Sequence, residues 1–191
     1  MKCMMIVAAV MVTATAAFAA EPSTPKDATL KATLTSKKES YVLDPAQQGE
    51  AFRKKIADAK EKGEAMPKPP AVEMVLTVTN TGKKDITLQI GGDESRIMLA
   101  LEGKGAVSVQ TNMMMTMDYR MGTPTKLAPG KSTEIKITSL AYGTRNISDY
   151  AYWTEPGEYT LTATLTAQTP EQEQGVTIVS EPLKVKVEAK K

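Results

Sequence analysis

Methionine is the residue whose spacing most directly suggests chemistry in this chain. Outside the first nineteen residues there are eight methionines, and five of them fall within nine positions: Met113, Met114, Met115, Met117 and Met121. Thioether sulfurs are soft ligands that can hold Cu(I) without any histidine. The sequence therefore contains a candidate Cu(I) site, provided that three of these sulfurs converge on one point that solvent reaches.

The same methionines also fit one face of a β-strand. Residues 106–121 alternate through most of their length, which would place Met113, Met115, Met117 and Met121 together with Val107 and Val109. Methionine fills irregular gaps in a core, and this core has little phenylalanine. We favour this core interpretation because it accounts for four of the five methionines, and we keep Cu(I) binding as the alternative.

Residues 141–152 are expected to be irregular in structure, and aromatic residues and an arginine gather between residues 142 and 153. Tyrosine, tryptophan and arginine are the types that anchor protein interfaces. The stretch therefore predicts a candidate recognition surface made of Tyr142, Arg145, Tyr150, Tyr152 and Trp153. The alternative is structural: the rings seal one end of a sandwich while the arginine pairs with a nearby carboxylate. We favour this sealing role for any single one of the five.

Several kinds of chemistry are excluded by composition. The chain has no histidine, and its one cysteine is Cys3. Serine or cysteine nucleophiles activated by histidine, and the usual zinc, haem and iron–sulfur ligand sets, are therefore missing. No glycine-rich phosphate loop or nucleophile elbow occurs either. We predict a protein that is not an enzyme and needs no cofactor.

The first nineteen residues are typical of a signal peptide. Lys2 precedes the apolar run from Met4 to Val12, and Ala17-Phe18-Ala19 forms a small-residue cleavage pattern. Removing residues 1–19 would leave 172 residues with 23 basic and 22 acidic side chains. This balance indicates neither nucleic-acid binding nor insertion into a membrane after cleavage. We expect an exported protein of the periplasm, the cell surface or the extracellular space.

The rest of the chain predicts strands around a single helix. Apolar and polar residues alternate in eight or nine segments, separated by turn signals every 8–12 residues. Between residues 44 and 70 the period changes: Phe52, Ile56 and Ala59 mark one face of an amphipathic helix over about residues 46–62. We predict an all-β fold, a two-sheet antiparallel Ig-like β-sandwich formed by one domain (20–191) with this helix inserted. An open barrel is the alternative.

The segment from Glu155 to Thr166 carries the strongest fold signal. Pro156 and Gly157 make a corner, after which Tyr159 opens a strict alternation of apolar residues and threonines. The spacing resembles the tyrosine corner of Ig-like sandwiches, in which the tyrosine hydroxyl binds the backbone a few residues upstream. We predict that Tyr159 makes this bond.

A wider resemblance covers most of residues 72–187. The succession NTGxxxI, LEGKGAVSV, LAPGKSTEI, SLAYGTR, AYWTEPGEYTLTA and SEPLKVKV is similar to a group of secreted bacterial proteins with an Ig-like sandwich. The shorter elements NTG, APGKS and PGEY resemble bacterial intracellular proteinase inhibitor domains. The first resemblance implies a fold and no activity; the second implies a loop that blocks a protease.

The expected function follows from these observations. We expect a non-catalytic exported binding or structural module whose partner is a protein or another cell-envelope component. Proteinase inhibition is a specific form of this expectation. Periplasmic Cu(I) binding by the methionine cluster is the alternative from a different class.

Overall fold

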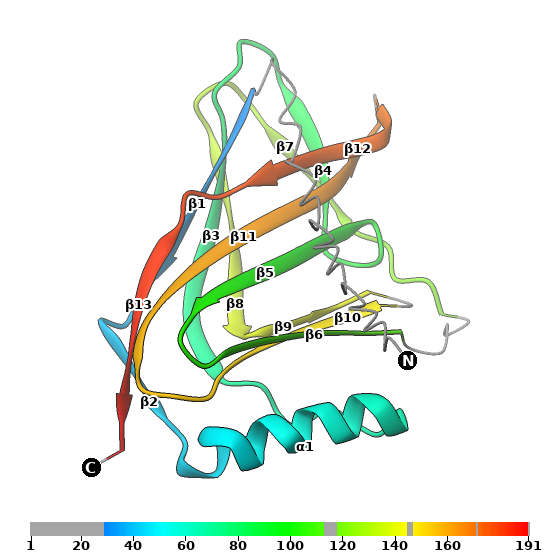
Figure 1. Cartoon of the computed structure of the whole chain (residues 1–191). Helices are drawn as coiled ribbons and strands as arrows, with labels where there is room; N and C mark the ends of the chain where they lie inside the picture. The colour runs from blue at the N-terminus through cyan, green and yellow to red at the C-terminus, as the bar shows by residue number, and fades with distance from the viewer. Residues whose placement is uncertain (1–28, 113–117, 145–146, 171, 191) are drawn as a thin grey trace, which may run out of the picture.

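The computed structural model describes residues 29–112, 118–144, 147–170 and 172–190 (Figure 1). The predicted signal peptide, residues 1–19, lies outside these ranges. Thirteen strands, one 3₁₀ helix and one α-helix are found in the described part of the chain. In chain order they are β1 (Leu30–Ser36), β2 (Ser40–Leu43), η1 (Pro45–Gln47), α1 (Gly49–Lys62), β3 (Ala71–Asn80), β4 (Ile86–Ile90), β5 (Ser95–Gly103), β6 (Ala106–Asn112), β7 (Thr123–Leu127), β8 (Ser132–Ser139), β9 (Ala141–Gly143), β10 (Ile147–Trp153), β11 (Gly157–Thr169), β12 (Gln172–Val179) and β13 (Leu183–Ala189).

The first layer of the fold is a sheet of β1, β3 and β8, with β3 in the middle and antiparallel to both neighbours. The alternation in β3 buries Val72, Met74, Leu76 and Val78 on one face. β4 and β7 pair antiparallel next to this sheet, beyond the end of β3. The buried Asn80 joins the two parts, because its side-chain amide donates to the carbonyls of Lys84 and Leu127, both at 2.8 Å.

The second layer is organised around β11, the longest strand. β5 pairs antiparallel with it along one edge, from Tyr159 opposite Gly103 to Ala167 opposite Ser95. The other edge of β11 is shared, because β13 pairs with its first residues and β12 with its last ones (Figure 1). β2 joins β13 in parallel. This parallel pair departs from the fully antiparallel arrangement that the sequence predicts.

One core fills the space between the two layers. β11 buries Leu161, Ala163, Leu165 and Ala167 completely, and these side chains belong to the same cluster as the apolar residues of β3. The predicted all-β, two-sheet sandwich with one inserted helix is therefore confirmed. None of the helices in the described ranges is long and apolar enough to span a lipid bilayer.

A small third sheet of β6, β10 and β9 lies between the sandwich and α1 (Figure 1). Two expectations are corrected here. Residues 141–152, expected to be irregular, form β9 and most of β10 because β10 pairs with β6 over seven residues. The long strand expected over residues 106–121 does not extend to its predicted end: β6 covers Ala106–Asn112, and residues 118–122 adopt no regular secondary structure.

The predicted helix begins slightly later than expected. The carboxylate of Asp44 caps the short η1 helix, accepting from the backbone N–H of Ala46 at 2.9 Å, and α1 follows from Gly49 to Lys62. α1 ends at Gly63, whose left-handed φ of +65° suits glycine at this position. Phe52, Ile56 and Ala59 are buried as predicted, with Phe52 and Ile56 packed on Val109 and Tyr152 of the third sheet.

Candidate functional site

Two of the five residues predicted to form a recognition surface are buried. Trp153 is 2% exposed, and its ring centroid lies 5.4 Å from that of Tyr41. Tyr152 is fully buried: its ring meets Phe52 edge-on at 5.7 Å, and its hydroxyl donates to the Pro67 carbonyl at 2.7 Å. Their predicted place on an exposed surface is corrected, because both side chains seal interior contacts. The alternative sealing role describes Tyr152 and Trp153 better than a recognition surface does.

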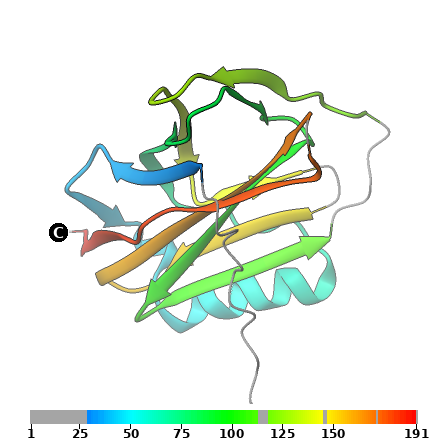
Figure 2. The same cartoon turned by 90° about the horizontal axis from the view of Figure 1, so that it is seen from above.

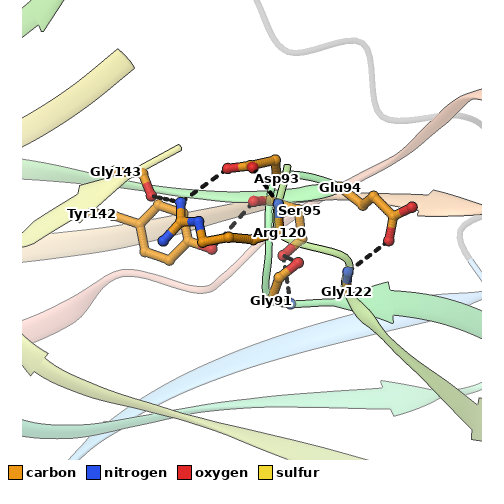
Figure 3. Close-up of polar contacts among 8 residues, drawn as sticks. All are labelled: Gly91, Asp93, Glu94, Ser95, Arg120, Gly122, Tyr142 and Gly143. Carbon is orange, nitrogen blue, oxygen red and sulfur yellow. Dashed lines mark hydrogen bonds and ion pairs between the residues drawn. The ribbon is translucent and has the colours of Figure 1, made fainter. Parts of the chain in front are cut away.

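Tyr142 belongs to a polar cluster that ties the turn between β4 and β5 to residues 120–122 (Figure 3). Its hydroxyl donates to the Ser95 carbonyl at 3.2 Å. Arg120 pairs with Asp93 at 2.9 Å, and its backbone N–H donates to the other oxygen of the same carboxylate. Gly92 permits this approach, because a Cβ there would lie 2.3 Å from the Arg120 carbonyl oxygen. Tyr142 therefore has a structural contact.

Arg145, another of the five residues predicted to form the recognition surface, lies outside the described residues. The carboxylates nearest to it in sequence, Asp149 and Glu155, are bound by other cations. Arg96 pairs with Asp149 at 2.7 Å, while Lys104 pairs with Glu155 at 3.0 Å.

The structure describes one residue of the methionine cluster. Met121 is 79% exposed, and the nearby Tyr119 is 51% exposed. The core interpretation is therefore wrong for Met121, because residues 118–121 are exposed and adopt no regular secondary structure. Met113, Met114, Met115 and Met117 lie outside the described residues, so Cu(I) binding stays a prediction.

The tyrosine corner is present as predicted. The Tyr159 hydroxyl donates to the Glu155 carbonyl at 2.6 Å, across the turn made by Pro156 and Gly157. Burial is the main reason that the pKa of Tyr159 is raised. This bond fixes the start of β11 against the end of β10, which is a structural role for these residues.

The interface between α1 and the third sheet is closed at the N-terminal end of α1. Arg53 of α1 pairs with Glu155 and donates from Nε to the Thr154 hydroxyl at 3.0 Å. The backbone N–H of Gly49 donates to the Thr154 carbonyl at 2.8 Å. A hydrogen bond from Lys104 lowers the pKa of Glu155 most, with a further contribution from Arg53. Helix and sheet are thus held together by ionic and backbone contacts at this end.

The other end of the same interface is open around Tyr150. A hollow of about 660 Å³ lies between the C-terminal end of α1 and β6. β5 and β6 diverge from their shared turn (Figure 2). A second hollow of about 500 Å³ is lined by residues of both strands. Gln110 and Tyr150 line both hollows. We call the two together the Tyr150 groove, lined by Ala59, Lys60, Gly63, Glu64, Ala65, Met66, Met98, Leu99, Ala100, Leu101, Glu102, Ser108, Val109, Gln110, Thr111, Asn112, Asp149, Tyr150 and Thr164.

Tyr150 differs from four other described tyrosines of the fold. Its ring stacks on Tyr152 with centroids 6.5 Å apart and an angle of 10° between the planes. The hydroxyls of Tyr41, Tyr142, Tyr152 and Tyr159 all bind backbone or side-chain groups. The Tyr150 hydroxyl makes no hydrogen bond to any described residue. A ring held in place in a groove, with a hydroxyl that no described residue binds, is an arrangement suited to recognition.

Polar side chains form part of the groove wall. Arg96 binds Asp149 through Nε at 3.1 Å and Nη2 at 2.7 Å, and Gln110 donates to the same carboxylate at 2.8 Å. The charges of Arg96 and Asp149 compensate each other, and fork-to-carboxylate pairing fixes both side chains. The groove therefore suits a ligand that stacks and hydrogen-bonds better than a strongly charged one.

The described residues offer little for acid–base or metal chemistry. They contain no group of three histidine, cysteine, aspartate or glutamate side chains that could hold a metal ion. Burial raises the pKa of Tyr152, which makes its hydroxyl a poorer acid at neutral pH.

Comparisons with known proteins leave the chain without a family. No protein-family model matches it, and no curated protein matches it in sequence. It is similar to a solved part of alpha-2-macroglobulin from Escherichia coli, from domain MG7 to the C-terminus, at 14% identity and a TM-score of 0.36; the match covers 84% of this chain but only 16% of that one.

Two further solved structures are similar at lower TM-scores. The CooA pilin subunit of enterotoxigenic Escherichia coli matches at 14% identity and 0.19, covering 83% of this chain and 99% of that one. A family 123 glycoside hydrolase from Clostridium perfringens matches at 8% identity and 0.24, with 83% and 27% covered. Such low TM-scores carry no argument, so the fold assignment rests on the strand pairing and the tyrosine corner. None of these matches supports the resemblance to proteinase inhibitor domains.

Proposed function

We propose that the protein is an exported, non-catalytic binding module that holds a segment of a partner protein of the cell envelope in the Tyr150 groove. One observation carries the proposal: the Tyr150 ring is fixed by stacking on Tyr152, yet its hydroxyl makes no hydrogen bond within the described residues. Tyrosine is enriched at protein interfaces because it offers a large rigid surface and a polar tip.

The shape of the groove favours a chain segment as its occupant. Its two hollows share Gln110 and Tyr150 in their lining, so a ligand that fills both would contact these two residues. Both walls offer amide, hydroxyl and apolar groups, including Gln110 and Met66, and no wall carries a dense charge. A peptide uses hydrogen bonds and apolar contacts of these kinds.

The proposal that the protein is exported rests on the signal-peptide pattern of residues 1–19. Cell fractionation together with the mass of the purified chain tests it. We expect the protein in the envelope or the medium, with its N-terminus at residue 20. A cytoplasmic protein that retains Met1 or begins at Lys2 would contradict the export part of the proposal.

Capture from native envelope extract tests the binding part. The immobilised protein should retain a partner that Tyr150→Ala loses, while Lys83→Ala, an exposed change remote from the groove, retains it. Equal capture by both variants would place the partner elsewhere. Treating the extract with a protease first should abolish capture; a signal that survives this treatment would contradict a protein partner.

Cu(I) binding is a second candidate function, favoured by the exposure of Met121. The methionine segment is tethered on both sides: Asn112 pairs with Ile147, and Gly122 donates to Glu94 at 2.8 Å (Figure 3). Competition with a chelator of moderate strength should show Cu(I) uptake that is lost when all five methionines become leucine. Met98→Leu, which changes an exposed methionine of β5, is the matched control and should retain uptake. An unaltered chain that takes up no Cu(I) would rule this function out.

A further inference from the structure

The two edges of the β1-β3-β8 sheet are not equivalent. At the β1 edge, Ala32 forms a parallel bridge with Ser180 next to β12, so this side of the sandwich is partly closed. β8 pairs with β3 alone among the described strands. A hollow of about 160 Å³ marks the mouth between the two layers at the β8 edge, lined by Ile97 and Leu99 of β5 and by Ile135 and Ile137 of β8. An unpaired edge of eight residues is a template for a further strand.

The backbone geometry shows which residues of β8 face outward. The carbonyl of Lys131 accepts from the backbone N–H of Asn80 at 2.9 Å, so the backbone groups of residue 131 point towards β3. Along a strand the direction of these groups alternates. Residues 133, 135 and 137 therefore bond to β3. The backbone groups of residues 132, 134, 136 and 138 point to the free edge.

The exposed side chains of β8 carry opposite charges two residues apart. Glu134 and Lys136 are both exposed, and neither forms an ion pair with any described residue. Ile135, between them, faces the core side and is only partly buried. β8 thus presents free backbone groups, one negative and one positive side chain, and an incompletely covered apolar residue.

We propose that this edge binds a second copy of the chain, with the two β8 strands antiparallel and the two-fold axis at Ile135. In this register all four outward-facing residues pair, Ser132 with Thr138 and Glu134 with Lys136 of the partner. Two reciprocal ion pairs form on the exposed face. Opposite charges directly across an antiparallel pair stabilise it. The two Ile135 side chains meet on the core side and cover the mouth between the layers.

Registers shifted by two residues are expected to be less stable than the proposed one. A shift of two residues in one direction places Glu134 opposite Glu134 of the partner, and in the other direction it places Lys136 opposite Lys136. Like charges directly opposite each other destabilise a strand pair. Either shift also leaves one outward-facing residue of each strand unpaired. Charge and backbone pairing therefore select the same register, and a symmetric contact of this kind closes on itself as a dimer.

Light scattering after size-exclusion chromatography tests the proposal by charge reversal. The unaltered protein should approach twice the mass of one chain as its concentration rises. Glu134→Lys and Lys136→Glu should each remain monomeric, and the two changes combined should restore the dimer. Lys83→Glu, a charge reversal in an exposed turn, should leave the dimer intact. A monomer at every concentration, or a dimer that survives both single changes, would overturn the proposal.

Cross-linking gives a second readout that does not depend on charge. Ile135→Cys, placed in a Cys3→Ser background, leaves one cysteine per chain, so any disulfide must join two chains. Residue 135 occupies a close, non-hydrogen-bonded pair in the proposed register, and mild oxidation with diamide should give a covalent dimer. Val42→Cys, on the exposed face of β2, is the control and should cross-link much less. Equal cross-linking at both positions would contradict the β8 contact.

Discussion

The two ends of the interface between α1 and the third sheet differ in how their aromatic side chains are held. At the closed end, Tyr152 is buried against Phe52, its hydroxyl binds the Pro67 carbonyl, and Arg53 joins helix to sheet through Glu155. At the open end, Tyr150 borders two hollows with its hydroxyl unbound within the described residues. Two tyrosines on the same strand, two positions apart, thus have different roles. The closed end holds the helix in place, and the open end offers a surface.

The largest effect is expected at the closed end. Tyr152→Ala should lower the free energy of unfolding by about 3–5 kcal/mol, because it removes a large buried ring from a packed interface. Denaturant unfolding followed by fluorescence measures it. Tyr152→Phe keeps the ring and should cost only about 1 kcal/mol through the lost hydrogen bond. A loss below about 1 kcal/mol for the alanine variant would show that this end of the interface is not a packed contact.

The tyrosine corner should contribute less. Tyr159→Phe should destabilise the protein by about 1 kcal/mol, because the Glu155 carbonyl loses its donor while the packing of the ring remains. The same unfolding measurement applies, with Thr160→Val on the opposite face of β11 as a control expected to be nearly neutral. An unchanged stability for Tyr159→Phe would mean that the hydrogen bond of the tyrosine corner does not stabilise the fold.

Protonation of Glu155 at low pH should weaken the closed end of the interface between α1 and the third sheet. Its pKa is lowered in the folded protein, mainly by Lys104, so the unfolded chain takes up this proton first as the pH falls. The contribution of the Glu155 carboxylate to the free energy of unfolding is present above the ordinary glutamate pKa of about 4.5. It is lost as the pH drops through the lower pKa that Glu155 has in the folded protein. Stability measured between pH 6 and about 3 should therefore fall more steeply for the unaltered protein than for Glu155→Gln. Parallel pH profiles would contradict a role for this ion cluster.

Much of the fold follows from local sequence patterns. The alternation of β3 and β11, the apolar stripe of α1 and the tie from Tyr159 were all predictable, because each depends on residues close together in the chain. The cap of the short η1 helix at Asp44 and the end of α1 at Gly63 also depend on residues close together in the chain. These elements meet at the core that the predicted sandwich requires.

The third sheet was missed because its pairing is long-range. β10 forms by pairing with β6, about forty residues earlier, and its aromatic residues lie on both faces because one face meets the core and the other meets α1. Simple apolar–polar alternation does not describe a strand covered on both sides. For the same reason the predicted recognition surface contained Tyr152 and Trp153, which are buried, alongside Tyr150.

The groove itself could be predicted only in part. Tyr150 stood out by residue type, but Gln110 reaches the groove from another strand, and the binding of Arg96 and Gln110 to Asp149 depends on the tertiary fold. A signal was present in the chain: Ser148, Tyr150 and Tyr152 alternate with Asp149, Ala151 and Trp153. In a strand, this spacing places the two tyrosines on one face and the tryptophan on the other, so a strand assignment would have separated them.

The most direct test of the central claim compares the same small change at the two ends. Tyr150→Phe and Tyr152→Phe each remove one hydroxyl, and both stability and partner capture from envelope extract are measured for each. We predict that Tyr150→Phe weakens capture and leaves stability within about 0.5 kcal/mol, the range of ordinary surface changes. Tyr152→Phe should lower stability and leave capture intact. Capture that depends on Tyr152 and not on Tyr150 would contradict the account.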